Sequence, residues 1–541
     1  MYRVCEAAGE IAGRFWRQHP ALFYALGMLL GVQAALQRAL YGFQTEQLIL
    51  ILPLGLLAFP LFLPAAMRSE GIHKRVILML VIACTSFFYV EYTYRFPRLP
   101  PEGLDGLAQI EIHALSSSRT PFAKTWTYKG NLVAFKTTQE GALPKTWEGG
   151  GETLARNLPF RLSLPQNEST IRPKADRDYI VRARLKEITP GNYRLSPHKN
   201  MPWQSIQGTY SLAEQRFWAK TQLSAYIHRQ IHGQAKANFL AGIATGDFDD
   251  RQLSVELSRF GLQHIMAISG FHFGIIAAIL GFFLRFAFPK KYTPFVLIGL
   301  LTAYFLFLGC GPSIMRAWIT IVVLLMGYIG QRQSFALNSL GLALLIVLFI
   351  DPLQCQNLGF QFSFLITAAI LLFYSPCAKG LQYLWRKRSL SQMVDMTWID
   401  QHGYLLLIFI KQALALAIAV NLIAFPMTLY IFHKFPWLSL AYNLFFPFLV
   451  SFAMLLLLLA LASSVCLPPL ADLLHALNNA YTGFLLNFVY NTPTSFDFYF
   501  RVSSFAFPLY MLYMCLVFAG GVVVRHRMEQ RDESLAEFAF L

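Results

Sequence analysis

Long apolar runs dominate both ends of the chain and frame one polar stretch between them. The first three runs are 21–40, 47–67 and 75–92. A run of about 18 or more apolar residues can cross a bilayer as a helix, because a helix satisfies its own backbone polar groups. We therefore predict a polytopic α-helical membrane protein with about twelve transmembrane helices. The further predicted crossings are 262–286, 294–310, 315–331, 335–350, 359–375, 404–424, 440–463, 472–490 and 505–524.

The polar stretch, 95–215, has a different pattern. Short runs of alternating apolar and polar residues are separated by segments that contain Gly and Pro, and no run has the length or period of an apolar helix. This pattern is typical of a small all-β barrel. We expect strands near 108–114, 123–129, 132–138 and 179–188.

Residues 216–238 interleave large apolar side chains with Arg, Lys and His. This mixture predicts an amphipathic helix that lies on the membrane surface. Its basic residues fit lipid headgroups as well as DNA, and both interpretations stay open. The chain then divides into a membrane segment 1–94, the β domain 95–215, the interfacial helix 216–238, a second membrane domain 239–524 and a tail 525–541.

The charge of the chain sets its orientation. Of the 541 residues, 55% are hydrophobic and only 14% are charged, yet the formal net charge is +16. Such a balance indicates either basic cytoplasmic loops or attraction to a polyanion. Arg14 and Arg17 precede the first run, and Arg525 and Arg527 follow the last. The positive-inside rule therefore places both termini in the cytoplasm, and three crossings place the β domain on the opposite, extracytoplasmic face.

Signatures of catalysis and of cofactor binding are missing from the sequence. The seven cysteines have no CxxC spacing, and neither an HExxH motif nor a GxxxxGK(S/T) loop occurs. We therefore expect no catalytic residue, metal ion or cofactor in this chain. Any ATP-driven motor or nuclease that works with it is expected to be a separate protein.

Two sets of residues in the β domain are candidates for binding single-stranded nucleic acid. The period of two in 179–188 places Arg182, Arg184 and Lys186 on one face, opposite the apolar residues. In 123–129 the same period aligns cationic and aromatic groups, the combination that contacts phosphates and stacks on bases. An alternative is that the two aromatic rings belong to the barrel core. The second set is Lys124, Trp126 and Tyr128.

Residues 263–272 hold the densest group of polar side chains within a predicted crossing. Ser269 and His272 are three residues apart and share a helix face, and His264 precedes them. Three interpretations remain open: a Ser–His pair of an intramembrane hydrolase, donors along a polar path, and hydrogen bonds between helices. The hydrolase is disfavoured because no Asp or Glu follows within a turn to orient the histidine.

Two more polar groups lie in predicted crossings. Arg316 follows Ser313 at the start of one span, and an arginine at that depth is a natural partner for phosphate if it faces a cavity. If it reaches to the interface instead, it is an anchor. Gln361 and Ser363 lie among aromatic residues in another span.

Several of these stretches, in this order, resemble the ComEC family of competence proteins. The resemblance adds Asp247, at the end of the first stretch, to the predicted path. It covers nearly the whole chain, although 1–215 matches by arrangement rather than by motif. The stretches are 239–247, 261–272, 312–317, 351–352 and 359–364.

The resemblance implies an OB-like fold for the β domain and an inner-membrane channel of bacteria that passes single-stranded DNA into the cytoplasm during natural transformation. It also implies three partners besides lipid: an extracytoplasmic DNA-binding receptor, a cytoplasmic ATP-driven DNA translocase and a separate nuclease. Many relatives continue into a metallo-β-lactamase-like domain, whereas this sequence stops at Leu541, so we do not expect it to degrade DNA. The alternative function is transport of a small molecule or lipid precursor.

Overall fold

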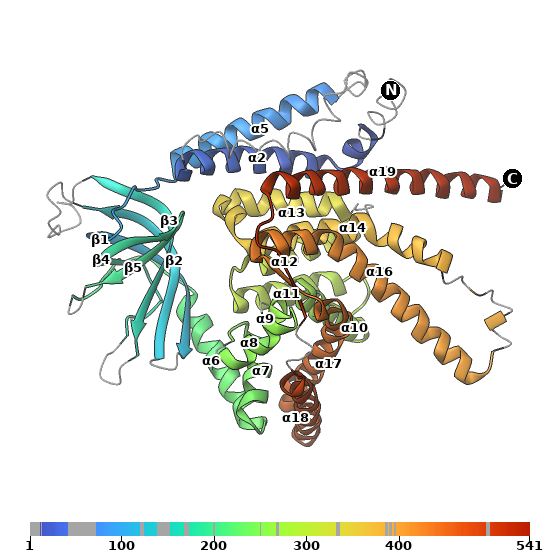
Figure 1. Cartoon of the computed structure of the whole chain (residues 1–541). Helices are drawn as coiled ribbons and strands as arrows, with labels where there is room; N and C mark the ends of the chain where they lie inside the picture. Colours follow the sequence, from blue (N-terminus) through green and yellow to red (C-terminus); the bar gives the residue numbers. More distant parts are fainter. Residues whose placement is uncertain are drawn as a thin grey trace.

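The computed structural model consists of a β-barrel beside a large helical domain (Figure 1). The predicted crossing 47–67 lies outside the residues that the structure describes. Those residues are 11, 13–41, 72–119, 124–137, 152–166, 172–198, 201–248, 250–266, 270–331, 336–384, 388, 392–393, 396–493 and 498–540.

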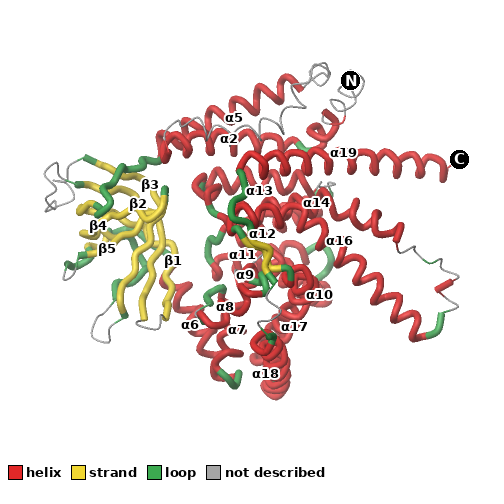
Figure 2. Tube along the Cα trace, viewed as in Figure 1, coloured by secondary structure: helices red, strands yellow, loops and turns green. Residues whose placement is uncertain are grey.

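The barrel is closed by five strands (Figure 2). They follow the order β1-β2-β3-β5-β4, and β4 pairs back onto β1. All of these pairs are antiparallel except β3 with β5, which is parallel. A short strand, β6, pairs antiparallel with the start of β4. The strands are β1 (Leu104–Arg119), β2 (Lys124–Lys136), β3 (Thr153–Pro165), β4 (Tyr179–Thr189), β5 (Asn192–Pro197) and β6 (Gln204–Ser205).

The described residues of 95–212 form strands and loops, as the all-β expectation for 95–215 requires, but not every expected strand is found. The runs 123–129 and 132–138 are one strand, β2, which continues through Gly130. At Gly130 a Cβ would overlap the backbone of β1, so a glycine is needed there for the close approach of the two strands. β3 was not expected, because Pro159 and Asn157 interrupt its pattern. Asn157 has a φ of 55°, and the buried positions change from odd to even numbers across it.

The helical domain has long and short apolar helices. Six described helices are long and apolar enough to cross a membrane, and four shorter apolar helices accompany them. The predicted total of about twelve is therefore not established by the described residues. The long ones lie in α2 (Pro20–Tyr41), α5 (Ile72–Thr93), α14 (Leu358–Leu384), α16 (Trp398–Phe432), α17 (Leu438–Cys466) and α19 (Phe507–Phe540); the short ones lie in α10 (Gly270–Ala287), α11 (Thr293–Leu308), α12 (Pro312–Ile329) and α13 (Ala336–Ile350).

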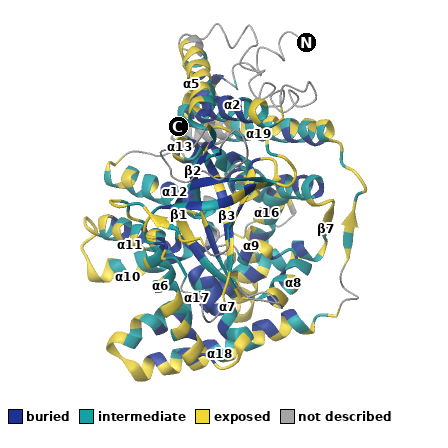
Figure 3. Ribbon diagram, turned by 90° about the vertical axis from the view of Figure 1, so that its left-hand side faces the viewer, coloured by how far each residue is buried: buried dark blue, intermediate teal, exposed yellow. Residues whose placement is uncertain are grey.

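Large apolar side chains are exposed on the outer faces of these helices, as the exposed parts of α10, α11 and α5 in Figure 3 illustrate. Phe286 is 72% exposed and Val465 is 83% exposed. Apolar surface of this extent is costly in water and is normal against lipid tails. The exposed faces therefore support the prediction of a polytopic membrane protein.

Two predicted segments differ from the structure at their boundaries. The predicted crossing 262–286 is not one helix: α9 (Gln263–Met266) is separate, and α10 begins at Gly270. The predicted interfacial helix 216–238 is two helices, α6 (Ala213–Gln230) and α7 (Gln234–Thr245). Gly233, with a φ of 103°, separates them, because that backbone conformation cannot continue a helix. The apolar side chains of α7 are buried in the helical core.

The predicted crossing 472–490 lies within α18 (Pro468–Asn491), a continuous helix. Three of its polar residues, His475, Asn478 and Thr482, are buried against neighbouring helices. His475 contacts the Tyr226 hydroxyl of α6 at 3.2 Å, and Asn478 donates to the Ala453 carbonyl of α17 at 3.2 Å. These side chains therefore join α18 to its neighbours.

The remaining elements are α8 (Arg251–Arg259), the 3-10 helix η3 (Pro352–Gln356), and the paired strands β7 (Lys434–Pro436) and β8 (Tyr499–Arg501).

The helical core consists of packed clusters that meet at α12. Ala317 is buried with residues of α7, α10, α11 and α17, whereas Met315 and Ile319 are buried with residues of α2, α13 and α14. Arg316 therefore lies on α12 between side chains that belong to two different clusters. A third cluster joins α14, α16 and α19.

Candidate functional site

Arg316 is the main buried cation among the predicted site residues. Its side chain is 8% exposed, and it donates from Nε to Ser363 Oγ at 2.6 Å and from Nη1 to Thr367 Oγ1 at 2.8 Å. Ser363 and Thr367 are four residues apart on α14, so both hydroxyls face α12. The structure thus brings together two of the predicted residues, Arg316 and Ser363.

The surroundings of Arg316 contain no compensating acid. Among the described residues, no carboxylate forms a salt bridge with its guanidinium. The guanidinium donates instead to the neutral hydroxyls of Ser363 and Thr367. The centre of the Phe364 ring lies 6.0 Å from the guanidinium carbon. A buried cation without a counterion is costly, and such an arginine attracts an anion. Arg316 could therefore bind an oxyanion without first breaking an ion pair.

Gly270, the first residue of α10, packs directly against Arg316. A Cβ at Gly270 would overlap the guanidinium, so no larger residue fits here without displacing the arginine. His272, two residues later, is 3% exposed, whereas His264 on α9 is exposed. Ser269 lies outside the described residues. The structure therefore places α10 beside the arginine and leaves the predicted Ser269–His272 pairing without a test.

No hydrogen bond or ion pair joins this arginine to three further predicted residues that the structure describes, Gln361, Ser313 and Asp247. Gln361 donates to the carbonyl of Cys355 at 2.9 Å and so holds η3 against α14. Ser313 is partly buried one turn before Arg316. Asp247, in the loop after α7, forms an ion pair with Lys220 of α6 at 3.2 Å. The sequence interpretation missed Thr367, although its spacing from Ser363 is a signal for a shared helix face. It included Lys220 only among the basic residues of 216–238, without a partner.

In the barrel, the interpretation of Tyr128 as a base-stacking residue is wrong. Its side chain is fully buried, its hydroxyl donates to the Pro173 carbonyl at 2.7 Å, and burial raises its pKa to about 12. Its ring is part of the barrel core, which was the alternative interpretation. Trp126 is partly buried against the same core, with the Arg172 guanidinium 5.9 Å from its ring centre, and Lys124 is exposed.

The expected alternation of β4 is confirmed. Arg184 and Lys186 are exposed between buried apolar neighbours, and Arg182 is partly buried. Their charges are not equally available, however. Arg184 donates to both carboxylate oxygens of Asp105, at 2.9 and 2.7 Å, and these bonds hold the pKa of Asp105 below its usual range. Arg182 contacts the Met201 sulfur at 3.4 Å.

The pairing of the strands creates a second cationic surface that the sequence interpretation missed. Lys129 of β2 lies opposite Arg161 of β3, Arg161 opposite Arg194 of β5, and Arg194 opposite Lys186 of β4. All four side chains are exposed, and none forms a salt bridge with a described residue. We call these four residues the cation row. At a strand spacing of about 4.8 Å, the row spans roughly 14 Å.

The barrel is joined to the helical domain through α6. Glu214 accepts two hydrogen bonds from Arg172 and one from the backbone of Ala175. The bonds from Arg172 hold the pKa of Glu214 below its usual range. Arg216 donates to the carbonyls of His113 in β1, at 3.0 Å, and Leu306 in α11, at 2.6 Å. One side chain therefore connects the barrel to a membrane helix.

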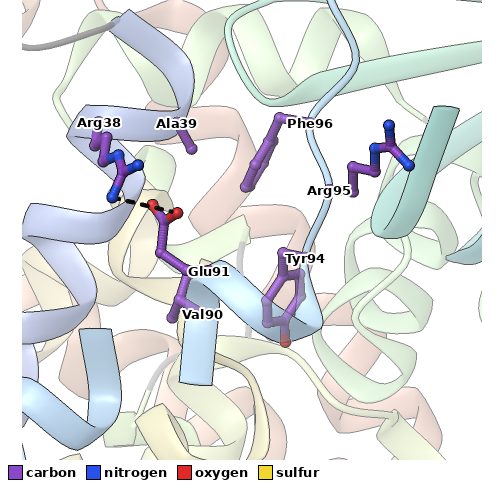
Figure 4. A pocket seen from close by; sticks show the side chains of 7 residues that line it. All are labelled: Arg38, Ala39, Val90, Glu91, Tyr94, Arg95 and Phe96. Carbon is purple, nitrogen blue, oxygen red and sulfur yellow. Dashed lines mark ion pairs between the residues drawn. The ribbon is translucent and has the colours of Figure 1, made fainter. Parts of the chain in front are cut away.

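A cavity of about 250 Å³ lies at the ends of α2 and α5, beside the segment that leads into the barrel (Figure 4). Its lining includes the ion pair of Arg38 with Glu91, whose nearest charged atoms are 3.7 Å apart. No residue of the predicted DNA path lines it. Among the described residues, no group of three or more His, Cys, Asp or Glu side chains could hold a metal ion.

Comparisons with known proteins match the second membrane domain. A family model described as competence protein matches residues 247–527, slightly more than half of the chain. The chain is similar to the ComE operon protein 3 of Bacillus subtilis (strain 168), with 26% identity over 187 residues. That similarity covers 34% of this chain and 21% of the relative, so the match spans about a fifth of the relative's length. No solved structure matches the chain significantly.

Proposed function

The chain belongs to the competence protein (ComEC) family, whose role is in DNA uptake during competence, and on this basis we propose that it forms the membrane channel for one strand of DNA. In this proposal the strand passes into the cytoplasm during natural transformation. The chain does no chemistry on the DNA in this proposal, and the polar groups of its path act as hydrogen-bond donors and cations.

The observation that carries the proposal is the buried guanidinium of Arg316. A polyanion cannot cross hydrocarbon without polar partners. Arg316 has hydroxyl neighbours and no acidic partner among the described residues, and it lies between two packed clusters of helices. A phosphate that reached it would gain charge-assisted hydrogen bonds. The boundary between the clusters, at α10, α12 and α14, is therefore the proposed path, with His264, Ser269, His272 and Ser313 as further members.

The barrel supports the proposal as an OB-like, DNA-binding domain. Five strands closed by β1 and β4, with one parallel pair between β3 and β5, are compatible with the small barrels that bind oligonucleotides. We propose that its cation row binds phosphates and that Trp126 and Lys124 border this surface. Binding of this kind is weak, independent of base sequence and sensitive to salt.

The orientation and the partners follow from the same proposal. The barrel faces the extracytoplasmic side of the bacterial inner membrane, where a DNA-binding receptor delivers the strand. Both termini lie in the cytoplasm, where an ATP-driven translocase draws the strand in. A separate nuclease removes the other strand. The basic residues at both termini of the chain support this orientation, because cytoplasmic segments of membrane proteins are enriched in Lys and Arg.

The proposal is tested by replacing Arg316 and measuring both uptake of labelled DNA and the abundance of the protein in the membrane. Arg316→Lys should keep part of the uptake, because a lysine retains the cation but loses the paired donors. Arg316→Ala should lose most of it. A matched control is Arg285→Ala, which removes an exposed arginine that stacks on Phe282 at the end of α10.

Normal uptake by Arg316→Ala, at normal abundance, would remove this arginine from the DNA path. Loss of uptake in Arg285→Ala to the same extent would mean that any lost arginine in this domain impairs the protein. Abundance must be measured in each case, since a buried substitution also lowers folding yield.

A further inference from the structure

One ion pair lies where the barrel meets the helical domain. Lys220 of α6 and Asp247, in the loop after α7, approach to 3.2 Å. The lysine side chain is 14% exposed, whereas that of the aspartate is 40% exposed. The cation is therefore held in place by the protein, and its partner carboxylate can reach solvent.

Asp247 lies at a position that does not favour an anion. Gly246, with a φ of 79°, caps the C-terminus of α7, and Asp247 follows directly. The negative end of a helix dipole repels a carboxylate. Besides the ion pair with Lys220, Asp247 has one further polar contact among the described residues. Its backbone N–H donates a hydrogen bond to Thr245 Oγ1 at 3.3 Å. Lys220 is therefore the main group that stabilises the carboxylate here.

The cation row ends near this pair. Lys129 pairs with Ala114 of β1, and the carbonyl of the adjacent His113 accepts a hydrogen bond from Arg216 of α6. Lys220 lies one turn after Arg216 on the same helix.

Lys129 is exposed by surface area, but protein atoms around its ammonium group lower its pKa by partial desolvation. The charges of Arg161 and Lys220 lower this pKa further, and the charge of Asp247 raises it. Lys129 is thus within electrostatic reach of both members of the pair. Two cations, Lys129 and Lys220, therefore lie near one exposed carboxylate, so an excess of positive charge remains after the ion pair forms.

We propose that Lys129 and Lys220 form a phosphate-binding site between the barrel and the helical domain, and that Asp247 occupies this site until a phosphate of a DNA strand displaces it. This inference rests on the proposed function. Phosphodiester and carboxylate oxygens accept the same charge-assisted hydrogen bonds from lysine. A DNA strand bound along the cation row can reach Lys220 through the same kind of hydrogen bond between a cation and a phosphate oxygen. The site therefore transfers the strand from the barrel to α6, the helix whose Arg216 contacts α11.

The proposal predicts opposite effects from the two members of one ion pair. Asp247→Asn removes the competing carboxylate and should tighten binding about two- to fivefold, the range that the strength of an exposed ion pair implies. Lys220→Gln removes a phosphate ligand and should weaken binding. Asp247→Glu keeps the charge and should bind as the wild type does. A purely structural ion pair predicts no tightening from any of these changes.

The experiment measures the affinity of a fluorescent oligo-dT strand for the purified full chain in detergent, over a range of salt concentrations. A control for the change in net charge is Glu152→Gln, because Glu152 pairs with Arg95 at 2.6 Å and both side chains are exposed. Glu152 directly precedes β3 and lies nine residues before Arg161. That separation is about 30 Å. Thermal melting of each variant shows whether it is folded.

The proposal is supported if Asp247→Asn tightens binding more than Glu152→Gln does and steepens the salt dependence. It is overturned if folded Asp247→Asn binds no more tightly than the control, and in that case the channel function still stands on the Arg316 measurements. If the wild-type chain does not bind oligo-dT at all, this inference and the proposed role of the barrel both fail.

Discussion

Replacing residues of the cation row should weaken DNA binding while it stabilises the barrel. The row places four cations next to one another on adjacent strands, and like charges that face each other across strands repel. Arg161 has a cationic neighbour on each side. Arg161→Gln removes both repulsions and should stabilise the barrel by about 0.4–2 kcal/mol, since each cross-strand charge pair contributes about 0.2–1 kcal/mol. A row kept only for stability would respond with the opposite sign.

The size of the binding effect follows from counterion release. For single strands, the slope of log affinity against log salt is about −0.7 for each phosphate that the protein neutralises. Four cations in the row give a slope of about −2.8, so a tenfold rise in salt weakens binding by roughly 600-fold. Arg161→Gln should reduce the slope to about −2.1 and the loss to roughly 130-fold.

The assay is titration of oligo-dT with the full chain at several salt concentrations, together with thermal or denaturant unfolding. The control variant is the double substitution Asp105→Asn with Arg184→Gln, which removes an exposed arginine already bonded to a carboxylate and leaves the net charge unchanged. It should keep the wild-type slope. A wild-type slope in Arg161→Gln, or a barrel destabilised by that change, would refute the assignment of the row to phosphate binding.

Two further predictions concern the barrel and its link to α6. The pKa of Glu214 is held below its usual 4.5, so its bonds to Arg172 should stabilise the fold fully above that pH and lose effect as the pH falls through the lowered pKa. Glu214→Gln should remove this part of the acid dependence of the melting temperature, and an unchanged dependence would contradict it. Tyr128→Phe should cost about 0.5–1.5 kcal/mol of stability and leave oligo-dT affinity unchanged, because the hydroxyl is bonded and the ring is buried. A clear loss of affinity at normal stability would return Tyr128 to the binding surface.

Sequence pattern predicted the long helices well and the strands less well. The expected runs 21–40 and 75–92 correspond to α2 and α5 within a few residues, because an uninterrupted apolar length is enough to identify a membrane helix. β3 was missed because Asn157 shifts its period and Pro159 lies within it. A rule that follows a strict period of two cannot recognise a strand with such an irregularity.

The candidate sites show the same limit. A polar residue in an apolar span is visible in the sequence, and Arg316 and Ser363 were both selected in that way. Their contact depends on how α12 packs against α14, 47 residues further along the chain, which no local period determines. The cation row depends on strand pairing, since Lys129, Arg161 and Arg194 become neighbours only in the folded barrel. For that reason sequence alone selected three cations on one strand, Arg182, Arg184 and Lys186, of which Lys186 belongs to the row.

The central claim is that this chain carries a DNA strand across the membrane. The most direct test measures labelled DNA that reaches the cytoplasm of competent cells, where external nuclease cannot degrade it, with and without the chain. The account predicts that protected label disappears without the chain, returns with the wild-type chain, and does not return with Arg316→Ala at equal abundance. Protected label that persists in cells without the chain would contradict it.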